Sequence, residues 1–106
     1  MESAMFTIRL FCAAGMSTSL LERRIRDAAK ERGIEVDVAA HPASEMDGNL
    51  DGVDAALIGP QVQFMFKQLE EKCAAKQVPV AVIPMREYGT VNGEKVLDLA
   101  LEIAGS

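Results

Sequence analysis

Short apolar runs alternate with helical patterns along the whole chain, and this alternation restricts the fold more than any other feature. Strand-like runs occupy residues 5–11, 34–40, 53–59 and 78–83. Apolar residues recur at helical spacing in residues 20–31, 62–73 and 94–104. Alternating strands and helices require a parallel sheet with helices on both faces, joined by right-handed crossovers. We therefore predict an α/β fold.

Several segments carry more detailed predictions. Residues 34–40 alternate apolar and acidic side chains, which is typical of a strand with one wet face near a sheet edge. Gly33 is expected to end the first helix. The polar residues 41–52 are compatible with a short helical turn after Pro42, and residues 84–93 are predicted to be a loop.

Length and charge limit the classes of protein that fit. The 106 residues suit one domain, predicted over residues 5–106, with residues 1–4 as an N-terminal extension whose origin the sequence does not decide. A net charge of -5 argues against binding nucleic acid through its phosphates. No apolar run approaches the ~20 residues that span a bilayer, and the chain opens without a basic signal-peptide region. We predict a cytoplasmic protein that does not insert into membranes.

The two cysteines are expected to be reduced thiols with different roles. Cys12 and Cys73 match no metal-ligand or CxxC spacing, so neither a metal site nor a cofactor is predicted. Cys73 shares a predicted helix face with Val62, Phe66 and Leu69, which favours a buried packing role.

Cys12 lies where the first predicted strand meets the first predicted helix. In parallel α/β sheets, ligands bind beyond the carboxyl ends of the strands. Small residues let the backbone curl around an anion, free N–H groups at a helix start attract it, and hydroxyls add donors. The predicted phosphate-binding residues are Ala13, Ala14, Gly15, Met16, Ser17, Thr18 and Ser19. The same positive environment would favour the Cys12 thiolate, which is the nucleophilic form.

A structural interpretation of the same segment stays open. Cys12 could be an inert core residue, and Ser19 with Glu22 fits a capping box at a helix start. The run of small and hydroxyl residues at a strand-to-helix junction favours the anion site instead.

The loop resembles that of the low-molecular-weight tyrosine phosphatases, in which an arginine stands six residues after the cysteine. Thr18 occupies that position here. A guanidinium would clamp the transferring phosphoryl group with two hydrogen bonds, so its replacement argues against efficient phosphoester hydrolysis. A small cysteine-dependent phosphatase or an arsenate-reductase-like enzyme is the second hypothesis. A non-enzymatic, anion-sensing regulatory module is the third, and it requires Cys12 to be dispensable.

A closer resemblance is to the IIB subunit of the lactose/cellobiose class of the bacterial sugar phosphotransferase system (PTS). It rests on "LFCAAGMSTSLL" (10–21), "LIGPQVQFM" (57–65), "PVAVIPMREYG" (79–89) and "NGEKVLDLAL" (92–101). The resemblance implies a four-stranded parallel sheet in the order 2-1-3-4, flanked by helices on both faces, with a phosphatase-like cysteine loop.

The resemblance also implies an enzyme component that carries a phosphoryl group in sugar uptake. Cys12 would accept the group from a phosphohistidine of a IIA partner and pass it, through a phosphocysteine, to a sugar bound by the membrane IIC permease. A β-linked disaccharide such as cellobiose or chitobiose fits the class. The chain itself decides neither the sugar nor the oligomeric state.

Other residues near the predicted strand ends allow two interpretations. Gln61 and Tyr88 follow the third and fourth strands, and the resemblance implies that they line the site or the docking surface. Ordinary turn chemistry and core packing explain them equally well. Met16, Met65 and Met85 fit either docking or core filling. Phe64 stands where tyrosine is common in the family, and His41 is predicted to be a surface loop residue.

Overall fold

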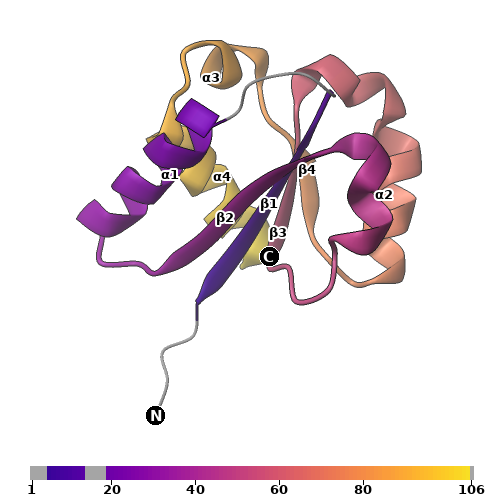
Figure 1. Cartoon of the computed structure of the whole chain (residues 1–106), viewed down its shortest axis with the longest axis horizontal. Helices are drawn as coiled ribbons and strands as arrows, with labels where there is room; N and C mark the ends of the chain where they lie inside the picture. The colour runs from indigo at the N-terminus through magenta and orange to yellow at the C-terminus, as the bar shows by residue number, and fades with distance from the viewer. Residues whose placement is uncertain (1–4, 14–18, 106) are drawn as a thin grey trace.

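A parallel sheet forms the centre of the structure, a computed structural model in which residues 5–13 and 19–105 are described (Figure 1). Its strands are β1 (Phe6–Cys12), β2 (Val36–Pro42), β3 (Ala55–Ile58) and β4 (Val80–Val82). All pairings are parallel, and the order is β2-β1-β3-β4. The predicted α/β sheet with order 2-1-3-4 is confirmed, and β2 lies at an edge as its alternating pattern indicates.

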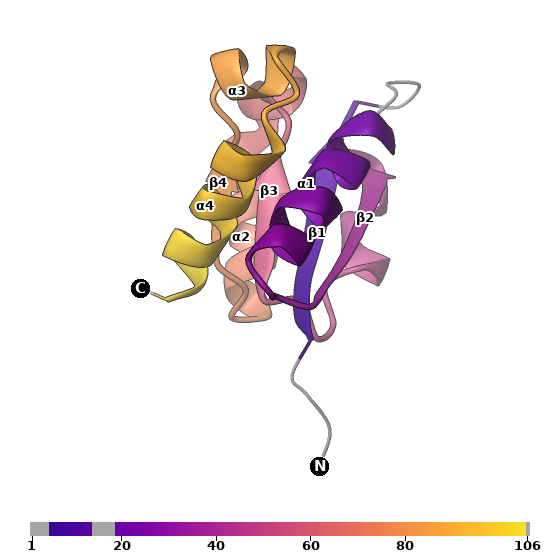
Figure 2. The ribbon, with the colours of Figure 1, turned by 90° about the vertical axis from the view of Figure 1, so that its left-hand side faces the viewer.

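Helices cover both faces of this sheet. They are α1 (Ser19–Glu31), α2 (Phe66–Ala75), α3 (Met85–Gly89) and α4 (Gly93–Ala104), with the 3-10 turns η1 (Ala43–Gly48) and η2 (Pro60–Met65). Figure 2 shows α1 and α4 side by side on one face, with α2 behind the sheet. None of the helices within residues 5–13 and 19–105 has the length and apolarity that crossing a membrane requires.

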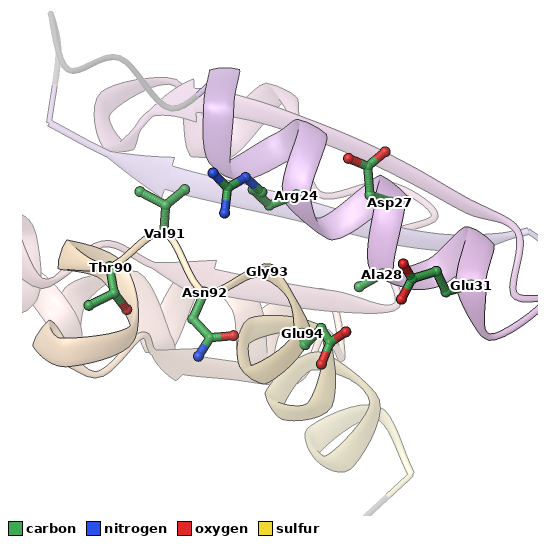
Figure 3. Close-up of a pocket in the computed structure, with 9 residues that line it drawn as sticks. All are labelled: Arg24, Asp27, Ala28, Glu31, Thr90, Val91, Asn92, Gly93 and Glu94. Atoms are coloured by element: carbon green, nitrogen blue, oxygen red, sulfur yellow. The ribbon is translucent and has the colours of Figure 1, made fainter.

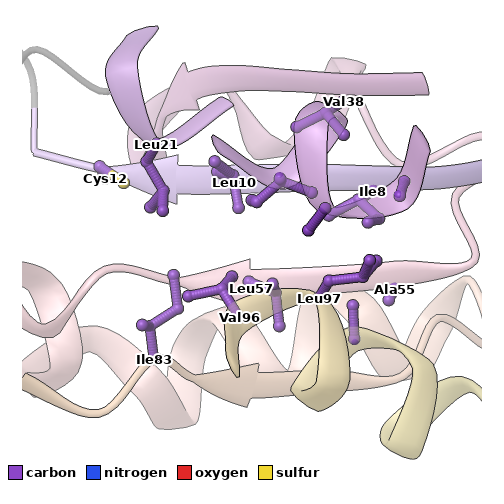
Figure 4. Packing of buried hydrophobic residues seen from close by; sticks show 14 residues of the cluster. Ile8, Leu10, Cys12, Leu21, Val38, Ala55, Leu57, Ile83, Val96 and Leu97 are labelled. Atoms are coloured by element: carbon purple, nitrogen blue, oxygen red, sulfur yellow. The ribbon is translucent and has the colours of Figure 1, made fainter. Parts of the chain in front are cut away.

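Strand β1 contributes to two hydrophobic cores because its side chains alternate between the faces. Ile8, Leu10 and Cys12 belong to the first core, between the sheet and helices α1 and α4 (Figure 4). Phe11 belongs to the second core, between the sheet and η1, η2 and α2. Cys12 therefore points toward the α1 and α4 side of the sheet.

The structure corrects the predicted loop at residues 84–93, because this segment contains helix α3. The Tyr88 N–H donates to the Pro84 carbonyl at 3.0 Å, and the Thr90 hydroxyl donates to the Arg86 carbonyl at 2.8 Å. A helix of 5 residues is too short to show an apolar period in the sequence.

The structure also corrects the placement of His41. Strand β2 continues to Pro42, so His41 lies within the strand and is half-buried, where a surface loop was predicted. It pairs in register with Phe11, and the two rings lie 6.2 Å apart. The polar segment after Pro42, which the sequence left compatible with a short helical turn, forms the 3-10 turn η1.

Candidate functional site

Cys12 is the last residue of β1, at the carboxyl edge where ligands bind in sheets of this type. It pairs with Pro42 of β2, and only 3% of its surface is exposed. Of the predicted phosphate-binding residues, Ala13 is half-buried after the strand and Ser19 begins α1. Ala14, Gly15, Met16, Ser17 and Thr18 lie outside the described residues, so the predicted cradle is not tested.

Tyr88 and Gln61 share this edge with Cys12. Tyr88 is carried by α3 after β4, and its hydroxyl hydrogen-bonds the Cys12 sulfur. Gln61 is carried by η2 after β3, and its side chain hydrogen-bonds Tyr88. The structure therefore brings together three side chains from the carboxyl ends of β1, β3 and β4.

Gly59 is a component of the site to which the sequence analysis assigned no role. Its N–H donates to the Phe11 carbonyl at 2.9 Å and also interacts with the Cys12 sulfur. A Cβ at this position would lie 3.0 Å from Cys12 Sγ and 2.8 Å from Gln61 Oε1. Because its φ of -65° suits any residue, glycine is needed here for space. A glycine directly after a buried strand was the available signal for such a close approach.

Gly59→Ala is expected to displace the Cys12 and Gln61 side chains while the fold persists. The atoms that clash are the ends of side chains, so the backbone can stay in place. We expect the rate of Cys12 modification to change at least severalfold, with a loss of stability of about 1 kcal/mol. Thiol alkylation kinetics and thermal unfolding measure the two effects. Unchanged alkylation kinetics would show that the space beside Gly59 is irrelevant to the thiol.

Burial raises the pKa of the Cys12 thiol, and hydrogen bonds from Tyr88 and Gly59 oppose this effect only in part. The sequence predicted an environment that favours the thiolate. That environment would come from residues 13–19, most of which lie outside the described residues, so it stays a prediction. Among the described residues the opposing effect is burial, because packing against the first core removes water from the sulfur. Burial likewise raises the pKa of Tyr88, so its hydroxyl is kept as a donor.

Gln61 presents a buried acceptor at the centre of this group. Its Oε1 atom has no hydrogen-bond partner in the part of the chain that the structure describes. The hydrogen bond from Gln61 to Tyr88 must therefore use Nε2 as the donor, which agrees with its lowering of the Tyr88 pKa.

Cys73 has the packing role that the sequence predicts. It is fully buried in the second core, and its sulfur lies 3.8 Å from Met46 Sδ. Burial raises its pKa to about 11, with a smaller contribution from Glu70. Cys73 is therefore a neutral thiol on the opposite side of the sheet from Cys12.

Other surface features lie apart from the Cys12 group. A cavity of about 430 Å³ lies between α1 and the start of α4, and its lining includes Arg24 and Glu31 of α1 and Asn92 and Glu94 on the other side (Figure 3). Met85 is 62% exposed, so it is no core residue, whereas Met65 packs partly against the second core. Within residues 5–13 and 19–105, no three His, Cys, Asp or Glu side chains are grouped to hold a metal ion.

Comparisons with known proteins identify the family to which this chain belongs. Residues 7–99 match the family described as the lactose/cellobiose-specific IIB subunit of the PTS system. The chain belongs to this family and is a phosphotransferase component of sugar phosphorylation.

Individual relatives agree with the family match. The galactose-specific EIIB component of Lactococcus lactis subsp. cremoris is 42% identical over 98 residues, covering 88% of this chain and 91% of the relative. The cellobiose-specific EIIB component of Lactococcus lactis subsp. lactis is 41% identical with the same coverage. The solution structure of a cellobiose-specific IIB protein from Borrelia burgdorferi has a TM-score of 0.81 and 38% identity, covering 98% of this chain and 95% of that one.

Proposed function

We propose that Cys12 is the residue that carries the phosphoryl group, and that the chain relays it in the cytoplasm from a IIA partner to a sugar held by a IIC permease. One observation carries the proposal. The Cys12 sulfur ends β1 at the carboxyl edge of the sheet, where the Tyr88 hydroxyl hydrogen-bonds it and the Gly59 N–H, which donates to the Phe11 carbonyl, also interacts with it. Donors that converge on a sulfur stabilise negative charge there during transfer.

The two transfers balance as exchanges of one bond each. In the first, the Cys12 sulfur forms a P–S bond while the P–N bond of the partner's phosphohistidine breaks, and the imidazole nitrogen keeps the electron pair and takes up the thiol proton. In the second, a sugar hydroxyl forms a P–O bond while the P–S bond breaks and its electrons return to the sulfur, which takes up the hydroxyl proton. Phosphoryl transfer depends on positioning and charge stabilisation, which fixed donors supply.

The burial of Cys12 has two consequences for such a relay. Docking of a partner has to uncover the sulfur, because only 3% of the residue is exposed. Exclusion of water from the site also protects a phosphocysteine from hydrolysis between the two transfers. We propose that Ala13 to Ser19 cradle the phosphoryl group and that Gln61 and Tyr88 line the site.

The sugar is proposed as a β-linked disaccharide such as cellobiose or chitobiose. A cellobiose-specific relative supports this class. A galactose-specific relative of nearly equal identity shows that overall similarity does not choose between sugars.

Reconstitution tests the relay. The protein is incubated with labelled phosphoenolpyruvate, the general phosphotransferase proteins and a IIA subunit, and then with IIC-containing membranes and cellobiose or chitobiose. We expect label on the protein only when IIA is present, followed by transfer to the sugar. Hydrolysis of para-nitrophenyl phosphate by the protein alone, without label transfer, would favour the phosphatase hypothesis instead.

Thr18→Arg is expected to shorten the lifetime of the phosphorylated protein. An arginine six residues after Cys12 would clamp the phosphoryl oxygens as in the phosphatases that the loop resembles, and would stabilise attack by water. We expect hydrolysis to accelerate roughly tenfold or more, measured as loss of label after the donor is removed. Thr18→Lys, which adds charge without the two-pronged geometry, is the matched control. An unchanged lifetime in Thr18→Arg would refute this explanation of the threonine.

A further inference from the structure

Gln61, Tyr88 and Cys12 form a chain of donors that ends on the sulfur. Gln61 Nε2 donates to the Tyr88 hydroxyl, and the Tyr88 hydroxyl donates to Cys12 Sγ. The other end of the same carboxamide, Oε1, lies beside Gly59 in the space next to the sulfur. Gln61 Oε1 lies 2.8 Å and Cys12 Sγ lies 3.0 Å from the point that a Cβ at Gly59 would occupy. Oε1 and Sγ are therefore near neighbours across the space beside Gly59.

The protonation state of Cys12 decides whether Oε1 can be satisfied. Oε1 is a buried acceptor without a partner among the described residues, and an unsatisfied buried acceptor is unfavourable. A neutral thiol has one proton to donate, and Oε1 is an acceptor beside it. The structure does not contain this bond, since Oε1 is unpaired among the residues it describes. A small rotation of the carboxamide that brings Oε1 within reach of the thiol proton would close a ring through Gln61, Tyr88 and Cys12 in which every polar group is paired.

A thiolate or a phosphocysteine removes that proton and brings an anion next to the carbonyl oxygen. A half-turn of the carboxamide about its terminal torsion exchanges oxygen and nitrogen with almost no change in shape. Nε2 then donates to the sulfur or to a phosphoryl oxygen, and Oε1 accepts from the Tyr88 hydroxyl. Both ends of the carboxamide are again satisfied.

We propose that Gln61 is a positioning residue whose carboxamide reverses between the thiol and the charged states of Cys12, with Oε1 toward the thiol and Nε2 toward the thiolate or phosphocysteine. The phosphocysteine part of this inference rests on the proposed function, whereas the thiolate part does not. The reversal gives the site an acceptor when the sulfur is protonated and a donor when it is anionic.

Among residues 5–13 and 19–105, Tyr88 is the titratable side chain that hydrogen-bonds Cys12. Its own titration can therefore affect the reversal of the Gln61 carboxamide. Uncharged residues from other elements lie beside Cys12: Leu21 of α1 (Figure 4), Pro42 of β2 and Gly59 after β3. Helix α4 contributes the apolar Val96 and Leu97 to the same core. His41 lies beside Phe11 on the opposite face of the sheet.

Two substitutions separate hydrogen bonding from packing. Gln61→Glu keeps the size of the side chain, but its carboxylate can only accept hydrogen bonds. Gln61→Met keeps a similar shape, cannot donate a hydrogen bond and accepts one only weakly. We expect Gln61→Glu to slow iodoacetamide alkylation of Cys12 at fixed pH at least tenfold and Gln61→Met to slow it less. The pH midpoint of alkylation should move upward in the same order. Equal effects of the two variants would indicate a merely structural role and overturn the proposal.

NMR of the side-chain amide of Gln61 tests the reversal directly, without any phosphoryl donor. Through a pH titration of the free protein, we expect the Nε2 protons to shift with the midpoint of Cys12 alkylation and to gain contacts with the Cys12 Hβ protons while losing contacts with Tyr88. In Cys12→Ser the side chain stays neutral, so the shift of the Nε2 protons that follows Cys12 should disappear. A shift caused by titration of Tyr88 should remain in this variant.

Nε2 protons that keep their Tyr88 contacts through the whole Cys12 transition would overturn the inference. Because this result does not depend on phosphoryl transfer, it leaves the relay proposal standing. Conversely, a reversal observed in a protein that accepts no phosphoryl group would overturn the proposed function and support the role of Gln61.

Discussion

Cys12→Ser is expected to abolish phosphoryl transfer while leaving the fold unchanged. Serine matches cysteine in shape, and the Tyr88 and Gly59 donors can still contact a hydroxyl. A serine hydroxyl without an adjacent base stays protonated at neutral pH and is a far weaker nucleophile than a thiolate. Transfer of label from IIA should fall by more than about a thousandfold, as happens when a nucleophile is removed. Circular dichroism and thermal unfolding check that the variant is folded.

The matched control is Cys73→Ser, because it changes the other thiol in the same way. Cys73 is fully buried among apolar side chains in the second core. A hydroxyl without a partner there should lower the free energy of unfolding by about 1–3 kcal/mol, while label transfer continues. Retained transfer in Cys12→Ser would support the non-enzymatic anion-sensing hypothesis and remove the basis for a phosphocysteine.

Gly93→Ala is expected to cause the largest loss of stability among the substitutions discussed. Gly93 begins α4 where this helix crosses α1, and a Cβ there would lie 2.5 Å from the Arg24 carbonyl oxygen and 2.6 Å from Arg24 Cβ. The backbone of α1 cannot yield as a side-chain end can, so the helices must move apart. We expect a loss of roughly 2–3 kcal/mol, measured by chemical denaturation, and a fall in Tm of roughly 10–20 °C.

Gly48→Ala is the control for Gly93→Ala. A Cβ at Gly48 meets no atom within 4 Å, and its φ is not in the left-handed region. We expect it to change the free energy of unfolding by less than about 0.5 kcal/mol. Equal stability of the two variants would contradict the close crossing of α1 and α4 at Gly93.

The fold was predictable because its signals are local. Strand-like runs and helical periods lie in separate stretches of sequence, and the structure reproduces the strands with ends shifted by up to two residues. The order of the strands came from the family resemblance. Helix α3 was missed because its 5 residues carry no period. His41 was misplaced because β2 continues in register with β1 through the polar residues after Ala40.

The site was predictable only in outline. The carboxyl ends of parallel strands meet at one edge, which predicted that Cys12, Gln61 and Tyr88 lie together. The burial of Cys12 was not predictable, because it depends on packing between β1 and helices distant in sequence. This tertiary effect sets the direction of the Cys12 pKa. The role of Gly59 likewise depends on side chains from two other segments.

Locating the phosphoryl group on the labelled protein tests the central claim most directly. Trypsin should release residues 10–23 as one peptide, with Cys12 as its only cysteine. After incubation with phosphoenolpyruvate, the general proteins and IIA, mass spectrometry of this peptide and phosphorus NMR of the intact protein identify the bonded atom. We predict one phosphoryl group on the Cys12 sulfur. Phosphate on His41, or a protein that supports sugar phosphorylation without a P–S bond, would contradict the account.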